Sequence, residues 1–237
     1  MTTVMLVHGA WHRSKTWEKL EAELHALGYG THAPALPSAG ERPTAGMHDD
    51  AAVVAQELAS IEGPVVLLGH SYGGMPITEA AAGARNVERL IYLAAYMPDE
   101  GQSLFDIEGR PTPDDVSGVL PLSSGARTSF YSDLPDAEAE QAMSTLVDQT
   151  VRSFAEKVGA VAWRDIPSTY VVPEDDQAIS PALQQKMAAQ AAEIRRLPSG
   201  HSPFLSQPRV LAALIDEIAC QRPAVPHRAL PGACTSG

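Results

Sequence analysis

Short apolar runs alternate with helix-prone runs along most of this chain, and the alternation limits the folds that it can adopt. Strand-like runs are predicted at residues 4–7, 29–33, 64–68, 89–95, 168–172 and 193–197. Helices are predicted between and after them, at residues 14–27, 49–61, 75–84, 181–192 and 205–220. Strands that alternate with helices in this way indicate a mostly parallel sheet with helices on both faces. The fold class is therefore α/β, and 237 residues suffice for one large domain.

The alternation breaks between residues 97 and 166. Prolines and glycines recur in this segment, and its helix-prone runs are confined to about 136–147 and 150–159. A segment of this length between two sheet strands is rarely structureless. We therefore predict a lid inserted at about 97–166 into a single domain that spans residues 1–220. The remaining residues, 221–237, hold three prolines and small polar residues and are predicted to form a flexible tail.

Gly69, Ser71 and Gly73 lie where a predicted strand gives way to a predicted helix. The run before them, 64–68, is short and apolar like a buried parallel strand, and the run after them, 75–84, is rich in alanine. A turn this tight leaves no room for side chains at the two glycines and exposes the serine hydroxyl at its corner. The pattern predicts Ser71 as a nucleophile. The alternative is a Gly- and Ser-rich turn without chemistry.

A serine hydroxyl needs a base to take its proton, and the base needs an acid to orient it. Of the eight histidines, His201 follows the last predicted strand, at the sheet edge where Ser71 also emerges. The predicted strand 168–172 leads into three candidate acids, Glu174, Asp175 and Asp176, among which the pattern alone does not choose. Asp99 is a weaker rival and is interpreted as a residue at the hinge of the lid.

Two backbone N–H groups are predicted to bind the oxyanion of a tetrahedral intermediate. Tyr72 follows the nucleophile, and Ala10 lies in the loop after the first strand. His8 and His70, at two strand ends, are interpreted as packed structural histidines. Residues of the first loop and apolar side chains of the lid are predicted to line the substrate pocket: Gly9, Trp11, His12, Phe105, Leu120, Phe130 and Tyr131. The alternative for the lid residues is that they only pack it onto the body.

Composition excludes several classes of function. A net charge of −12 disfavours nucleic acid and anionic membrane surfaces as partners. The scattered histidines, the two cysteines near the C-terminus and the absence of a P-loop predict neither a metal nor a cofactor. No signal sequence or membrane-spanning run is recognisable, so a cytoplasmic protein that acts on a small molecule is expected. A homodimer is an open alternative.

With these residues assembled, the chain resembles the α/β-hydrolase superfamily. More narrowly, it resembles the branch that contains plant methylesterases, hydroxynitrile lyases and small bacterial esterases. The matching segments are residues 4–12, 68–74, 91–98, 163–172 and 200–203. In this branch the strand commonly runs Tyr-x-x-x-x-Glu-Asp-x-x-Ile with the Asp catalytic. Counting from Tyr170 and back from Ile179, the resemblance implies Asp176 as the acid, with Asp175 as the runner-up.

The resemblance also implies an activity. The hydroxynitrile lyases of this branch carry threonine where Gly9 stands and lysine where Ser202 stands, so the departures favour ester hydrolysis. The expected enzyme is a cofactor-free carboxylic ester hydrolase that forms an acyl-enzyme on Ser71, with His201 and Asp176 completing the triad. The alternatives are a hydroxynitrile-lyase-type reaction, a lactonase or cyclase in a biosynthetic pathway, and a ligand-binding protein on the same scaffold.

Overall fold

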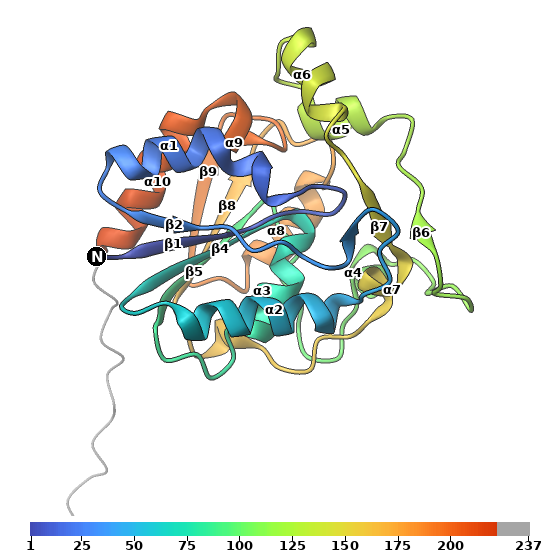
Figure 1. Ribbon diagram of the computed structural model, residues 1–237, viewed down its shortest axis with the longest axis horizontal. Coiled ribbons are helices and arrows are strands. Elements are labelled where there is room, and N and C mark those ends of the chain that lie inside the picture. Colours follow the sequence, from blue (N-terminus) through green and yellow to red (C-terminus); the bar gives the residue numbers. More distant parts are fainter. Residues whose placement is uncertain (222–237) are drawn as a thin grey trace, which may run out of the picture.

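Six strands form one parallel sheet in the order β2-β1-β4-β5-β8-β9 (Figure 1). The structure is a computed structural model and describes residues 1–221. The strands are β1 (Thr3–Val7), β2 (Gly30–His32), β4 (Val65–His70), β5 (Val87–Leu93), β8 (Ser168–Pro173) and β9 (Glu193–Leu197). Every neighbouring pair is parallel, so the carboxyl ends of all six strands lie at one edge of the sheet. Ligand sites of such sheets form at that edge.

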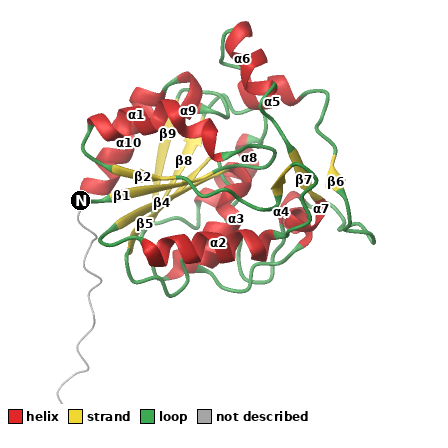
Figure 2. Cartoon of the chain, viewed as in Figure 1, coloured by secondary structure: helices red, strands yellow, loops and turns green. Residues whose placement is uncertain are grey.

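Helices cover both faces of the sheet (Figure 2). One face is covered by α1 (Glu18–Ala26), α9 (Pro203–Ser206) and α10 (Pro208–Cys220), and the other by α2 (Met47–Ser60), α3 (Gly74–Ala80) and α8 (Pro181–Ala188). Successive strand residues point to opposite faces. Leu6 of β1 therefore packs with the first group, whereas Val7 packs with the second. The predicted α/β class, a mostly parallel sheet flanked by helices, is confirmed.

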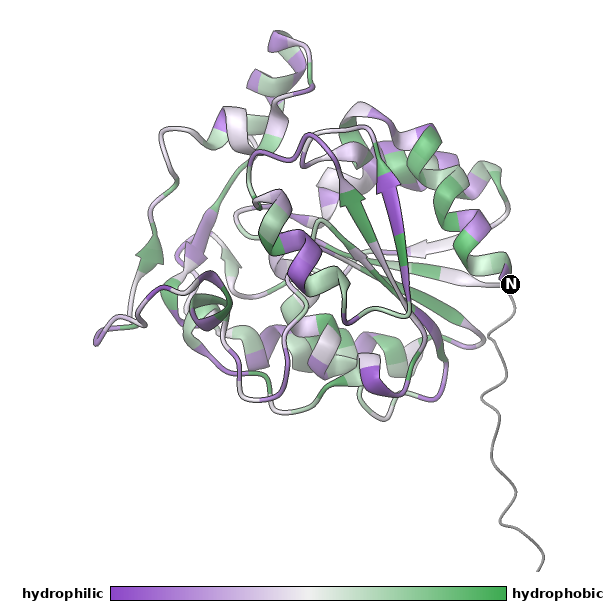
Figure 3. Ribbon diagram, turned by 180° about the vertical axis from the view of Figure 1, so that it is seen from behind, coloured by the Kyte–Doolittle hydropathy of each residue, from purple (hydrophilic) through white to green (hydrophobic). Residues whose placement is uncertain are grey.

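The edge strand β9 differs in composition from the inner strands. Each residue of its neighbour β8 is buried, whereas Ile194 and Arg196 of β9 are exposed. Figure 3 shows the contrast as a hydrophilic strand beside a hydrophobic one. Charged side chains along an edge strand discourage pairing with a further strand.

Residues 97–166, which we call the insertion, connect β5 to β8, and their part from α4 to α7 lies beyond the carboxyl ends of the strands (Figure 1). Its helices are η3 (Ala162–Arg164), α4 (Leu104–Glu108), α5 (Ala126–Tyr131), α6 (Asp136–Met143) and α7 (Val151–Ala155). Its strands are β6 (Val119–Leu120) and β7 (Asp148–Thr150), and β7 also pairs with β3 (Ala39–Gly40) of the preceding body. Asp99 and Arg164, near the two ends of the insertion, form an ion pair.

Several predicted helices begin or end elsewhere. The run predicted as one helix at 14–27 divides into a 3-10 turn, η1 (Ser14–Trp17), and α1. The helix predicted at 205–220 is α10, which begins only at Pro208, because a proline has no backbone N–H to continue a helix from α9. The helix predicted at 150–159 is the shorter α7, since Glu156 is extended.

The predicted tail lies almost wholly outside the described residues, which end at Gln221. Within residues 1–221, no helix has both the length and the apolar character needed to cross a membrane.

Candidate active site

Ser71 occupies a strained corner between β4 and the short helix η2 (Ser71–Gly73), which leads into α3. Its φ of +52° lies in the left-handed region that non-glycine residues rarely adopt. A Cβ at Gly69 would lie 2.6 Å from the carbonyl oxygen of Gly73, and a Cβ at Gly73 would lie 2.4 Å from that of Val7. Gly69 is therefore required because the backbone of η2 lies against it, and Gly73 is required because β1 lies against it.

His201 and Asp176 are buried and joined by a hydrogen bond of 2.9 Å between Nδ1 and Oδ2. Asp176 lies in the loop after β8 and His201 in the loop after β9. The carboxylate also accepts bonds from the backbone N–H groups of Ala178 and Ile179 and from the amide of Gln184. Because the carboxylate oxygen accepts, Nδ1 of His201 is the protonated nitrogen, and Nε2 is left as a base.

The other candidate acids lie away from His201. The side chains of Glu174 and Asp175 are exposed, and the Asp175 N–H donates to the carbonyl of Ser199. Asp99 pairs with Arg164. Gln184, which supports Asp176 from α8, was not predicted, because a glutamine in a helix eight positions after an acid has no recognisable pattern.

His70 links the turn at Ser71 to the loop of His201. Its Nε2 donates to the carbonyl oxygen of His201 at 2.9 Å, and the two imidazole rings lie 4.5 Å apart between centroids. The Ser71 hydroxyl is half-buried and makes no hydrogen bond with any residue in 1–221. Catalytic hydrogen bonds often tighten only when substrate is bound. The structure thus brings the segments of Ser71, Asp176 and His201 together at the carboxyl edge of the sheet.

The histidines beside His201 are uncharged at neutral pH. Burial lowers the pKa of both His8 and His12 to about 4, and it lowers the pKa of His70 well below its ordinary value. His8 donates Nδ1–H to the Gly9 carbonyl and accepts from the backbone of Leu36. These bonds are those of packed structural histidines, the role predicted for His8 and His70.

The loop after β1 passes directly beside Ser71. A Cβ at Gly9 would lie 3.0 Å from Cβ of Ser71 and from Nδ1 of His70. The N–H of Ala10, next in the chain, has no acceptor among residues 1–221. The N–H of Tyr72 belongs to the first turn of a helix, where backbone donors lack helical partners. Two backbone donors are therefore available beside the serine.

A cavity of about 420 Å³ contains Ser71, Ala10 and Tyr72 in its wall. Trp11, Leu120 and Phe130, three of the residues predicted for a pocket, line it as well. The remaining lining residues, most of them not predicted, are Tyr96, Glu108, Arg110, Pro121, Leu122, Ser123, Ala126, Ser129, Phe154, Ala178 and Ile179. The wall is mainly apolar, and its two charged side chains, Glu108 and Arg110, bond to each other at 2.9 Å.

Four residues predicted for the pocket do not line this cavity: Gly9, His12, Phe105 and Tyr131. His12 donates from Nδ1 to the Ala10 carbonyl at 2.7 Å and accepts from the hydroxyl of Tyr131 at 2.8 Å, so these two side chains are engaged with each other. Phe105 is only 1% exposed and packs against the ring of Phe154. Apolar character alone did not reveal which side chains of the insertion face the cavity and which face the core.

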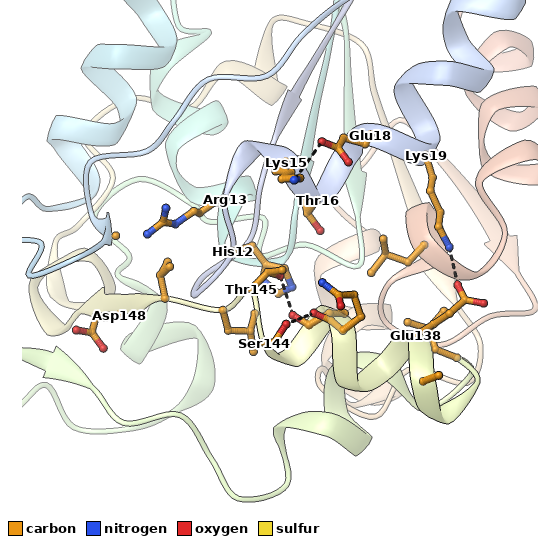
Figure 4. Close-up of a pocket in the computed structure, with 18 of the residues that line it drawn as sticks. His12, Arg13, Lys15, Thr16, Glu18, Lys19, Glu138, Ser144, Thr145 and Asp148 are labelled. Carbon is orange, nitrogen blue, oxygen red and sulfur yellow. Dashed lines mark hydrogen bonds and ion pairs between the residues drawn. The ribbon is translucent and has the colours of Figure 1, made fainter.

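A second, larger cavity of about 900 Å³ lies between the first helices and α6 (Figure 4). His12 lines this cavity, and Ser71 does not. Lys19 of α1 bonds to Glu138 of α6 across it at 2.5 Å, as Figure 4 shows. Positive and negative side chains both line its rim. Arg13 lies near Glu41, and Lys15 lies near Glu18. Within residues 1–221, no group of three or more His, Cys, Asp or Glu side chains is placed to hold a metal ion.

The sequence matches known proteins over most of its length. The model of the alpha/beta hydrolase family matches residues 4–214. The alpha/beta hydrolase nvfD of Aspergillus novofumigatus is 31% identical to this chain over 91% of it and 96% of the relative. The pyrethroid hydrolase of Sphingobium wenxiniae is 29% identical over 92% of this chain and 88% of the relative.

The fold also matches solved structures. The crystal structure of the methylesterase MES16 from Arabidopsis has a TM-score of 0.79 to this chain, covers 92% of it and 99% of its own chain, and, at 24% identity, shows the shared fold. Methylesterases of Arabidopsis thaliana are also relatives in sequence. The predicted resemblance to the methylesterase-like branch is therefore confirmed. The chain is a hydrolase and belongs to the alpha/beta hydrolase family.

Proposed function

We propose that this hydrolase cleaves a small carboxylic ester through an acyl-enzyme on Ser71, with His201 and Asp176 as the other members of a triad. One observation carries the proposal, the buried hydrogen bond of 2.9 Å between His201 and Asp176. It supports a role for Nε2 of His201 as a base at the sheet edge where the Ser71 turn emerges. His12 and His70, which lie beside His201, are neutral, so neither competes with it for the carboxylate as a positive charge.

In the first half-reaction, the Ser71 oxygen attacks the ester carbonyl carbon while its proton passes to Nε2 of His201. The negative oxygen of the tetrahedral intermediate accepts from the N–H groups of Ala10 and Tyr72. Collapse of the intermediate breaks the bond to the leaving alkoxide, which takes the proton from His201 and departs as an alcohol. Asp176 stabilises the imidazolium form of His201 during both transfers.

In the second half-reaction, water attacks the acyl-enzyme and gives a proton to His201. The same two N–H groups hold the second oxyanion. When the bond to the Ser71 oxygen breaks, the proton returns to that oxygen, and the carboxylic acid leaves. Each step is a proton or acyl transfer, so the reaction needs no redox partner.

The cavity beside Ser71 supports an uncharged, mainly apolar substrate. Its charged pair, Glu108 and Arg110, is internally neutralised, and Tyr96 also donates to Glu108. A cavity of about 420 Å³ accommodates a small ester. The names of the relatives, which include methylesterases, agree with an ester as the substrate.

The geometry around Gly9 and Ser202 disfavours the lyase alternative. A threonine at position 9 would crowd both Ser71 and His70, since even its Cβ would lie 3.0 Å from each. Ser202 is fully buried, so a lysine at that position would place its charge among packed side chains. Either residue that distinguishes the lyases of this branch would therefore require its neighbours in the present packing to shift.

Rapid mixing with p-nitrophenyl butyrate tests the proposed function. We expect a burst of nitrophenol equal to the enzyme concentration, followed by slower turnover, because the activated aryl ester should acylate Ser71 faster than water hydrolyses the acyl-enzyme. Ser71→Ala should abolish the burst and lower kcat by about 10⁴-fold or more. Turnover that survives this substitution would exclude the acyl-enzyme. Dihydrocoumarin in the same assay tests hydrolysis of a lactone, and mandelonitrile tests the lyase reaction.

A further inference from the structure

Trp11, the residue after the proposed oxyanion donor Ala10, has a left-handed φ of +61°. This conformation is rare for a bulky residue and persists only when its surroundings hold it. Its N–H donates to Oε1 of Gln149 at 3.2 Å, and its carbonyl accepts from the N–H of Val147 at 2.9 Å. Its indole N–H donates to the carbonyl of Leu120 at 3.3 Å. All three partners belong to the insertion, so the insertion holds this strained residue.

The peptide unit between Ala10 and Trp11 is fixed along both of its edges. The carbonyl of Ala10 accepts from Nδ1 of His12 at 2.7 Å, and the N–H of Trp11 donates to Gln149. Because a peptide unit is planar, these two bonds fix the orientation of the unit that follows Cα of Ala10. The Ala10 N–H belongs to the preceding unit, whose Gly9 carbonyl accepts from Nδ1 of His8 at 2.9 Å and from the N–H of His12 at 3.4 Å. The two units meet at Cα of Ala10, so Gln149 helps to hold the residue that carries this N–H without touching the N–H itself.

The amide of Gln149 is itself fully buried and oriented by two hydroxyl groups. Its Nε2 donates to Oγ of Ser38 at 2.8 Å and to Oγ of Ser153 at 2.7 Å. With the nitrogen held in this way, Oε1 must face Trp11. The side chain has no exposed alternative position, since its exposed fraction is 0%.

The same network reaches the second proposed oxyanion donor. Oγ and the N–H of Ser38 donate to the buried carboxylate of Asp50 at 2.5 and 2.9 Å. The hydroxyl of Tyr72 donates to the same carboxylate at 2.5 Å. A continuous chain of hydrogen bonds therefore runs from Trp11, through Gln149, Ser38 and Asp50, to Tyr72. At one end, Trp11 follows the proposed donor Ala10 in the chain. At the other end, Tyr72 is itself the second proposed donor.

We propose that Gln149 is a positioning residue of the oxyanion hole, through which the insertion holds the backbone at Ala10 in place. This inference rests on the proposed function, because it needs an oxyanion at Ser71. Interactions that are ready before the reaction stabilise the transition state without stabilising bound substrate equally. The loss of Gln149 should therefore lower kcat and leave KM nearly unchanged.

Gln149→Met and Gln149→Glu separate the two kinds of hydrogen bond that Gln149 makes, acceptance from Trp11 and donation to the two serines. Methionine keeps the length of the side chain but has no acceptor for Trp11, whereas glutamate keeps the oxygen and loses the amide donors. We expect Gln149→Met to lower kcat per titrated active site by about tenfold or more, below the 10²–10³-fold for a lost oxyanion donor. Gln149→Glu should keep more of kcat although it places a carboxylate near Asp50 and is the less stable variant. A purely structural role requires the reverse order, with kcat following stability.

Ser103→Ala is the matched control, because Ser103 is an equally buried residue of the insertion whose hydroxyl accepts from the N–H of Asp106 and takes no part in the network of Gln149. We expect its kcat per site to stay within about twofold of the wild type. Burst amplitudes count correctly folded sites in every variant, so misfolding lowers the amplitude and not kcat per site. A trifluoromethyl ketone, which forms an oxyanion on Ser71, should bind Gln149→Met more weakly by the same factor as kcat falls.

Two results would overturn the inference. One is a kcat per site for Gln149→Met within twofold of the wild type, and the other is an equal fall in Ser103→Ala. Failure of the proposed function looks different, because the wild-type protein itself would then show no burst, or Ser71→Ala would retain turnover. The two failures are therefore distinguishable in one set of measurements.

Discussion

The interactions that stabilise the body of the molecule differ from those that stabilise the insertion. The sheet of the body is buried on both faces by apolar side chains that alternate along each strand. The insertion consists of short helices and strands of two or three residues, and it contacts the body through polar groups as well as through buried apolar side chains such as Phe105 and Phe154. Asp133, for example, accepts from the N–H of Gly200, next to His201. The body therefore carries the proposed reacting groups, and the insertion bonds to the loops on which they lie.

The largest effects should come from the body, at the proposed acid. Asp176→Asn should lower kcat by about 10⁴-fold, because an amide in place of the carboxylate favours the wrong tautomer of His201. Asp175→Asn is the matched control, since its side chain is exposed one residue away. Steady-state kinetics on p-nitrophenyl butyrate measure both. Equal losses in the two variants would contradict the assignment of Asp176.

Gly73 of the body is closely surrounded by other atoms, whereas Gly118 of the insertion is not. Gly73→Ala should destabilise the protein by about 3 kcal/mol or more, because the new Cβ would lie 2.4 Å from the Val7 carbonyl. Gly118 in the insertion has a φ of +85° but open space around it, so Gly118→Ala should cost only about 1 kcal/mol of backbone strain. Urea unfolding measures both changes. Equal costs would show that packing at the turn does not require Gly73.

Acid should destabilise the body, which carries the buried histidines, whereas the insertion contains no histidine. The pKa of His8 and of His12 is lowered from 6.5 to about 4 in the folded protein. Above pH 6.5 both states are neutral at these positions. Between pH 6.5 and 4 the unfolded chain binds protons that the folded protein excludes, so the free energy of unfolding decreases as the pH falls.

Each of these two histidines should contribute about 3 kcal/mol to that loss, which levels off below pH 4. His12→Gln keeps a donor and an acceptor and should make the loss between pH 6.5 and 5 smaller by roughly 2 kcal/mol. Urea unfolding at several pH values provides the measurement. A pH dependence identical to that of the wild type would mean that His12 titrates normally.

The contrast between the two regions also explains what the sequence could predict. Ser71 and His201 belong to strand ends, where alternating apolar runs and glycines mark the positions locally, and the family pattern pointed to Asp176. Gln149 and Gln184 were not found, because each acts through contacts with residues distant in sequence. Strands as short as β3 and β6 have no recognisable periodicity. In the insertion, Phe105 and Phe130 look alike in sequence, and only tertiary packing makes one face the core and the other the cavity.

Those two phenylalanines provide the smallest and most selective test. Phe130 lines the cavity, and its ring lies 5.8 Å from that of His201, so Phe130→Ala should raise KM for an apolar ester by about tenfold through lost contact with the substrate. Phe105→Ala should instead lower stability by about 3–5 kcal/mol, with KM per titrated site unchanged, because its ring is buried in the core. Kinetics on esters of increasing acyl length, together with urea unfolding, separate the two outcomes. If both variants changed KM alike, the cavity would extend to Phe105 during turnover, and the insertion would rearrange around the substrate instead of holding a fixed wall.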